Sequence, residues 1–177
     1  MCTALDDTEC YGDYYQWGRG ADGHQESNST VTSTLATDIN ASNANGIFIT
    51  NSSSPYDWTT ADANGNLRAR EWSKIDGTSI CPVGYRVPTI DELTAETINA
   101  STAVTNNTDA FNNFLKFPSA GYRGHSDGSL YLQASGGFVW SGSVSGSYSQ
   151  YLFFLSGGAR TDGGGRANGL SVRCLRD

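Results

Sequence analysis

The sequence predicts an α+β fold, with two short helices and a small antiparallel sheet joined by long loops. Three observations lead to this prediction. A capped helix signal follows Pro88, a second apolar pattern of helical spacing covers residues 109–117, and strand-like runs separated by glycine-rich turns fill the chain after Pro118. Helical signals therefore come first and strand signals follow, which is the order expected of an α+β domain.

The composition favours one folded, loop-rich domain over residues 1–177. Charged residues make up 16% of the chain and hydrophobic residues 37%, while glycine contributes 21 residues. The charged and hydrophobic percentages are both below the averages for globular proteins, yet the chain carries 4 Trp, 9 Tyr and 7 Phe. Because so many aromatic rings are costly to leave in water, we expect a folded chain rather than a disordered one.

Charge and hydropathy exclude two classes of partner. The formal net charge is −7 and no basic stripe is present, so the chain lacks the electrostatic basis for binding nucleic acid. No run of 18 apolar residues occurs, which argues against membrane insertion. Residues 1–10 are polar and acidic, are not a signal peptide, and read as the middle of a domain, as in a trimmed chain.

Four cysteines allow two disulfides. None lies in a Cys-x-x-Cys pair, and both histidines lie in glycine-rich loops, so a zinc site is not expected. The preferred pairing is Cys81–Cys174, which would close the domain, with Cys2–Cys10 as a local clip. Four reduced thiols remain the alternative.

The first 66 residues divide into a compact element and a polar excursion. Residues 10–19 are aromatic and predict a short ordered element, helix or strand. Residues 25–66 are rich in Asn, Ser and Thr, and we interpret them as a loop-rich insertion. Its apolar run, residues 47–49, and Trp58 are expected to pin it to the domain.

Two helices are predicted in the middle of the chain. Thr89 and Glu92 form a capping box ahead of an apolar pattern. The second helix covers residues 109–117 and ends before Pro118. Its apolar residues recur at helical spacing and are expected to be core; they are Phe111, Phe114, Leu115 and Phe117.

Three strands are predicted after Pro118, over residues 138–141, 148–155 and 170–175. In the last, Leu170, Val172 and Cys174 alternate with outward-facing Ser171 and Arg173. Glycine clusters between these runs are interpreted as turns.

Residues 120–166 have the composition of a binding surface. Gly, Ser and Tyr make up more than half of this window, as in antibody paratopes, where tyrosine supplies contact area and Ser and Gly supply adaptable polar contacts. An ordinary set of glycine-rich turns explains the composition equally well. Asparagine, common elsewhere, is absent between Phe114 and Ala167, although turns usually favour it.

Several phrases of the sequence resemble a known group of proteins. The phrases are YGDYYQWGR from Tyr11, ADGH from Ala21, CPVGYRVPT from Cys81, SAGYR from Ser119, Trp140-Ser141, and RANGLSVRC from Arg166. Together they resemble the variable proteins of diversity-generating retroelements, which have a C-type lectin fold related to that of formylglycine-generating enzymes. The resemblance covers most of residues 10–177 and is weakest over residues 25–66.

The resemblance implies a ligand-binding domain whose residues 120–166 are diversified. In this group a reverse transcriptase changes adenines, chiefly in Asn codons, which would explain the missing asparagines. Gly121, Tyr122, Trp140, Ser141 and residues 168–174 would be fixed scaffold. The candidate ligand-binding residues have side chains that altered Asn codons can encode; they are Gly124, His125, Asp127, Tyr131, Leu132, Phe138, Val139, Tyr148, Tyr151, Phe153, Leu155, Arg160 and Asp162.

The strand over residues 148–155 must divide these candidates between two faces, because strand side chains alternate. We assign Leu152 and Phe154 to the core, and Tyr151, Phe153 and Leu155 to the ligand face. A register error of one residue would invert this assignment.

Two other functions were weighed. A formylglycine-generating enzyme would need a cysteine pair near its active site, but the C-terminal half contains only Cys174, so no enzyme is predicted. A sugar-binding lectin, with or without calcium, is the closer alternative, although its usual Glu-Pro-Asn and Trp-Asn-Asp motifs are absent. No cofactor is expected beyond a structural calcium, for example near Asp57 or Asp62, or a site using Asp127 and Asp162.

The expected partner is a protein or other macromolecule on a host or neighbouring cell. The expected location is a virion tail, a cell surface or the secreted fraction. Ligand identity and oligomeric state do not follow from the sequence.

Overall fold

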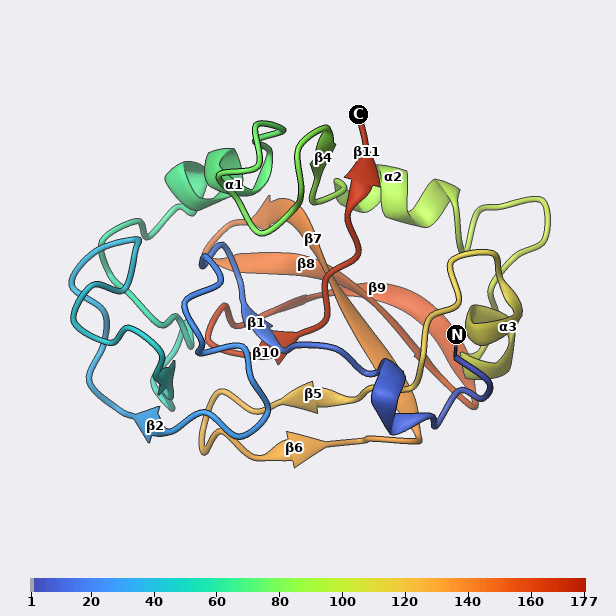
Figure 1. The fold of residues 1–177 in the computed structure, drawn as a ribbon, viewed down its shortest axis with the longest axis horizontal. Helices are drawn as coiled ribbons and strands as arrows, with labels where there is room; N and C mark the ends of the chain where they lie inside the picture. The colour runs from blue at the N-terminus through green and yellow to red at the C-terminus, as the bar shows by residue number, and fades with distance from the viewer. Residues whose placement is uncertain (1) are drawn as a thin grey trace.

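The structure is a computed structural model and describes residues 2–177. It is an α+β fold, as predicted, in which short helices surround several small sheets (Figure 1). The helices are η1 (Thr8–Cys10), α1 (Asn66–Trp72), α2 (Ile90–Ala95) and α3 (Asn107–Asn112). The strands are β1 (Tyr15–Gln16), β2 (Val31–Thr32), β3 (Phe48–Ile49), β4 (Tyr85–Arg86), β5 (Tyr122–Arg123), β6 (Leu130–Tyr131), β7 (Gly136–Ser145), β8 (Tyr148–Leu155), β9 (Gly158–Gly164), β10 (Gly169–Leu170) and β11 (Leu175–Arg176).

The main sheet is an antiparallel meander of β7, β8 and β9, which crosses the centre of the molecule in Figure 1. One face of this sheet packs against α2 and α3. Leu93 of α2 and Ala110 of α3 belong to the same buried cluster as Val139, Leu152 and Phe154 of the sheet. This cluster is the core on the helical side of the sheet.

A second sheet has the strand order β1-β10-β5-β6 and lies beside the main sheet. A second core cluster joins the two, because Trp17, Trp72 and Trp140 pack together with Leu170. The indole N–H of Trp140 donates to the Tyr15 carbonyl at 2.9 Å, and that of Trp17 donates to the Ser141 carbonyl at 2.8 Å. These bonds fix the N-terminal strand against β7.

The polar segment 25–66 is pinned as predicted. Phe48, Ile49 and Trp58 are completely buried, and β2 and β3 form a short parallel pair. A charged cluster adds a tie that the sequence did not predict. Asp57 accepts hydrogen bonds from Arg68 at 2.7 Å and from Arg166 at 3.2 Å, and both guanidinium groups are fully buried.

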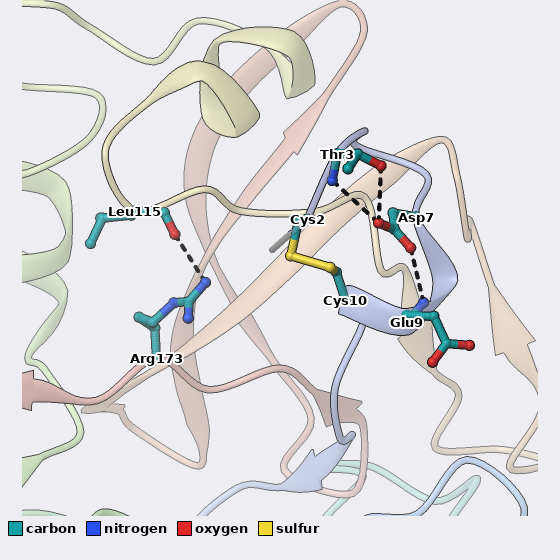
Figure 2. The surroundings of a disulfide bond; sticks show 7 residues. All are labelled: Cys2, Thr3, Asp7, Glu9, Cys10, Leu115 and Arg173. Atoms are coloured by element: carbon teal, nitrogen blue, oxygen red, sulfur yellow. Dashed lines mark hydrogen bonds between the residues drawn. A yellow bond between two sulfur atoms is a disulfide. The ribbon is translucent and has the colours of Figure 1, made fainter.

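Both predicted disulfides are confirmed. Cys81 and Cys174 are bonded with a Cα–Cα distance of 5.8 Å and join β4 and β11 regions that are 93 residues apart. Figure 2 shows the local bond between Cys2 and Cys10, beside which Asp7 accepts from Thr3 and from the Glu9 amide. All four cysteines are therefore in disulfide bonds, and none is a free thiol.

The two predicted helices differ in outcome. The capping box is confirmed at the start of α2, since the Thr89 hydroxyl accepts from the Glu92 amide and the Glu92 carboxylate accepts from the Thr89 amide. The second helix starts and ends earlier than predicted, over α3. The Asn113 side chain accepts from the Leu115 amide at 2.9 Å, which offers the backbone a local alternative to helix. Phe114 is consequently 70% exposed, so its assignment to the core is wrong.

The strand predictions were right in the centre of the sheet and wrong at its margins. The span of β8 is confirmed at both ends, and β7 extends the predicted 138–141 run in both directions. Residues 170–175 do not form one strand. Leu170 ends β10, while Leu175 starts β11 and pairs with Arg86 of β4.

β9 and α1 are among the elements that the sequence did not predict. β9 was interpreted as glycine-rich turns, although it pairs with β8 over its whole length. The N-cap residue of α1 is Gly65, which has no side chain to cap the helix, so the usual polar N-cap signal is absent from the sequence.

Candidate functional site

The face of the main sheet opposite α2 and α3 carries three of the aromatic side chains predicted to contact ligand, namely Phe138, Tyr151 and Phe153. Phe138 lies opposite Phe153 in the β7–β8 ladder, and Trp140 lies opposite Tyr151. Side chains of opposed residues share a face, and neighbours along a strand alternate. The predicted alternation is therefore confirmed for the core, since Leu152 and Phe154 are fully buried on the helical side.

Strand β9 adds a charged row to the same face. Arg160 is paired with Phe153 and Asp162 with Tyr151 in the β8–β9 ladder. The guanidinium carbon of Arg160 lies 4.9 Å from the centre of the Phe153 ring. This distance is that of a cation–π contact, so the face already holds one cation against one of its rings.

Five rings from two sheets form a continuous surface, which we call the aromatic face: Tyr122, Tyr131, Phe138, Tyr151 and Phe153. Tyr122 stacks on Tyr131 with ring centres 5.4 Å apart and meets Phe138 edge-on at 4.9 Å. Phe138 lies 5.8 Å from Phe153, nearly parallel to it, and 6.2 Å from Tyr151. The rings hold one another in place, so the surface is preorganised.

A groove of about 490 Å³ opens over this face. It brings together six of the predicted ligand-binding residues: Gly124, His125, Tyr131, Leu132, Phe138 and Tyr151. Tyr122, Ser126, Asn168 and Leu170 complete the lining. Aromatic walls with a few oriented polar groups are typical of ligand sites.

His125 is held at the wall of the groove by backbone and side-chain contacts. Its Nδ1 lies 2.9 Å from the Asn51 carbonyl oxygen, and its backbone N–H donates to Asn168 Oδ1 at 3.1 Å. A carbonyl oxygen only accepts, so Nδ1 carries the proton in this contact. The ring packs against Tyr56, with centres 4.5 Å apart.

Two carboxylates belong to the surroundings of the groove. Asp127 accepts from the Tyr131 hydroxyl at 2.7 Å and from the Ser129 amide at 3.0 Å, and these bonds lower the Asp127 pKa, the amide bond most. Asp162 lies opposite Tyr151. Burial, and then the Asp162 charge, raise the pKa of Tyr151 to about 12, so its hydroxyl stays protonated. The rings of the aromatic face are neutral, the carboxylates of Asp127 and Asp162 lie beside it, and the guanidinium of Arg160 covers Phe153.

The remaining candidates lie outside the groove. Phe153, Leu155 and Arg160 line an adjoining hollow of about 370 Å³ at the β8–β9 turn. Phe153 is on the expected face but only 7% exposed, because Phe138 and Arg160 cover it. Tyr148 shares the strand parity of Leu152 and lies on the other face of β8.

The assignment of Val139 to the ligand-binding residues is wrong. Its side chain is 3% exposed and packs in the core with Leu152, on the helical face of the sheet. It cannot contact ligand there. The reason is strand alternation, because Phe138, its neighbour in β7, faces the groove and Val139 must therefore face the core.

Three lining residues had been assigned to the fixed scaffold, namely Tyr122, Asn168 and Leu170. They come from β5, β10 and the turn before β10, far from β8 in sequence. Only the pairing of β5 with β6 and β10 brings them to the groove, and no local pattern encodes that pairing.

The expected calcium position near Asp57 or Asp62 is filled by arginine. Both carboxylates accept hydrogen bonds from Arg68, and Asp57 also binds Arg166. A guanidinium occupies the oxygens that a cation would need. Across residues 2–177, no three His, Cys, Asp or Glu side chains lie close enough to hold a metal ion together.

Comparison with protein-family models, with curated proteins and with solved structures finds no match. Within the part of the chain that the structure describes, no helix has the length and apolar character needed to cross a membrane.

Proposed function

We propose that this protein is a ligand-binding domain of C-type lectin fold, whose aromatic face is diversified by a retroelement to bind macromolecules. It is displayed on a virion tail or a cell surface, or is secreted. Its partner is a protein or other macromolecule on a host or neighbouring cell. It needs no cofactor and carries out no reaction.

The groove over the aromatic face is the observation that carries this proposal. It gathers six predicted contact residues from β6, β7, β8, the β5–β6 turn and the β6–β7 connection, which span 28 positions of sequence from Gly124 to Tyr151. Mutually packed rings lose little conformational entropy when a partner docks, and exposed aromatic residues are common energetic centres of interfaces.

The backbone at Leu132 is compatible with diversification, although Ala41, Tyr56 and Lys116, outside residues 120–166, adopt a similar φ. Its φ is 56°, in the left-handed region that leucine avoids and asparagine tolerates. A position built for asparagine and then rewritten at its codon would show this mismatch. The two disulfides fit an oxidising, extracellular setting.

The test is the DNA around the gene. We expect a near-copy of the segment that encodes residues 120–173, beside a gene for a reverse transcriptase. Differences should fall at adenines of the copy and at the codons for Leu132, Phe138, Tyr151, Phe153, Arg160 and Asp162. The core codons for Leu152 and Phe154 should be identical in both.

Residues 25–66 provide the control, since this segment lies outside the variable region and should have no copy. If no near-copy and no reverse transcriptase are found, diversification is wrong, and the protein is a binding module with a fixed surface. Differences spread evenly over both faces of β8 would contradict the assignment of the aromatic face.

A further inference from the structure

The groove combines neutral rings with nearby negative charge. Tyr122, Tyr131, Phe138 and Tyr151 line it, and no lysine or arginine does. Asp127 is bonded to the hydroxyl of Tyr131, and Asp162 is the ladder partner of Tyr151. The chain as a whole has a net charge of −7. The faces of aromatic rings attract cations, and carboxylates at the margin add to that attraction.

The protein's own arginine shows that this face accepts a cation. Arg160 lies over Phe153, which is a ring outside the groove. Among the described residues, no arginine or lysine lies over the four rings that line the groove; these rings pack against one another and against Phe153. The acceptors that a guanidinium or ammonium needs are also present, because the carboxylates of Asp127 and Asp162 are exposed.

We infer that the groove receives an arginine or lysine side chain of a protein ligand, with its charged head between the rings and the flanking carboxylates. This inference rests on the proposed function, since it names the chemistry that the proposed binding face recognises. The charges of Asp127 and Asp162 favour a basic side chain in the groove. An acidic side chain would be repelled by these carboxylates, and an apolar one would gain no electrostatic attraction from them.

The experiment uses the full chain labelled with ¹⁵N and two matched probes, N-acetyl-arginine amide and N-acetyl-norleucine amide. Backbone amide shifts of Gly124, His125 and Ser126 report on the groove. We expect the arginine probe to move these signals in a saturable way, with an affinity about tenfold above that of the norleucine probe, as expected when a cation–π contact is added.

Variants separate the ring from the carboxylate. Asp162→Asn changes an exposed side chain, so the fold is retained, and it should weaken the arginine probe about threefold while leaving the norleucine probe unchanged. Tyr151→Leu should remove most of the preference for arginine. Tyr85→Leu is the control, because it alters an exposed ring on β4 that does not line the groove.

Equal affinities for the two probes, or no shift of the three amides with arginine, would overturn the inference. Preferential binding of methyl α-mannoside would also overturn it and assign the groove to a sugar. These outcomes are separate from the proposed function, because the DNA comparison does not depend on the ligand's chemistry. A near-copy found together with failed arginine binding would reject only the basic side chain.

Discussion

At the scale of single residues, the backbone of the β6–β7 connection is strained next to the groove, which Leu132 lines. Leu132 has a φ of 56° and Ala134 one of 61°. Leu132 is also 46% exposed, so its side chain gains little from burial in exchange. The left-handed conformation costs an L-residue roughly 1–2 kcal/mol, and asparagine recovers part of that cost.

We therefore predict that Leu132→Asn raises the free energy of unfolding by about 0.5–1 kcal/mol. Denaturant unfolding of both proteins measures the change. Leu130→Asn is the matched control, because Leu130 is exposed on β6 and is not among the residues with positive φ. An equal gain in both variants would show that surface polarity, and not the backbone, is responsible.

His24 makes stability depend on pH. The side chain is fully buried, where its Nε2 accepts from the Gln16 amide and its Nδ1 bonds Asp22. Burial is the largest cause that lowers the pKa of His24 to about 4, and the nearby charges of Arg19 and Arg123 act in the same direction. The neutral ring is the form that the fold requires.

We predict that the free energy of unfolding decreases as the pH falls from about 6.5 to about 4. In this pH window His24 becomes protonated in the unfolded chain but stays neutral in the folded chain, so a lower pH favours unfolding. Denaturation curves at several pH values measure the slope. His24→Gln should flatten it, and parallel curves for the two proteins would show that other groups cause the loss.

At the scale of elements, β8 separates two environments. Leu152 and Phe154 are buried against the helices, while Tyr151 and Leu155 are only partly covered on the other side. This strand could be predicted from sequence to the residue, because its apolar run is long and bounded by glycine turns. β9 could not be predicted, because its glycines, Gly158, Gly163 and Gly164, are also typical of turns. They form a strand because they pair with β8.

We predict that Phe154→Ala lowers the free energy of unfolding by about 3–5 kcal/mol, because it leaves a cavity in the core beneath β8. Arg160→Ala, on the exposed side of the neighbouring strand, should change it by less than about 1 kcal/mol. Thermal or denaturant unfolding compares the two. Similar losses would mean that both faces of the sheet are core.

At the scale of the whole molecule, long-range ties hold together a chain with little regular structure. The pairing preferred from cysteine count and spacing is the one that the structure has, although the sequence left four reduced thiols as an alternative. The charged ties were not predictable, because nothing local marks Arg68 or Arg166 as buried, or Asp57 as their shared partner. The groove was predictable in its residues from β6 to β8, and unpredictable in those contributed by β5 and β10.

We predict that the two disulfides contribute unequally to stability. Replacing Cys81 and Cys174 by serine should lower the free energy of unfolding by roughly 4–5 kcal/mol, because that bond closes a loop of 93 residues. The Cys2 and Cys10 pair spans 8 residues and should contribute roughly 2–3 kcal/mol. Unfolding of the two double variants measures both. A larger loss from the short loop would mean that contacts at the N-terminus dominate.

The burial of the arginine cluster has a consequence for the ionic environments in which the protein works. Dissolved ions screen exposed charges over about 10 Å at 0.1 M salt, but they act far less on charges sealed from water. Arg68 and Arg166 are fully buried and Asp57 is 5% exposed. We therefore expect the polar segment 25–66 to stay fixed to the sheet at low and at high salt, whereas the attraction that we propose at the exposed Asp162 should weaken as the salt concentration rises.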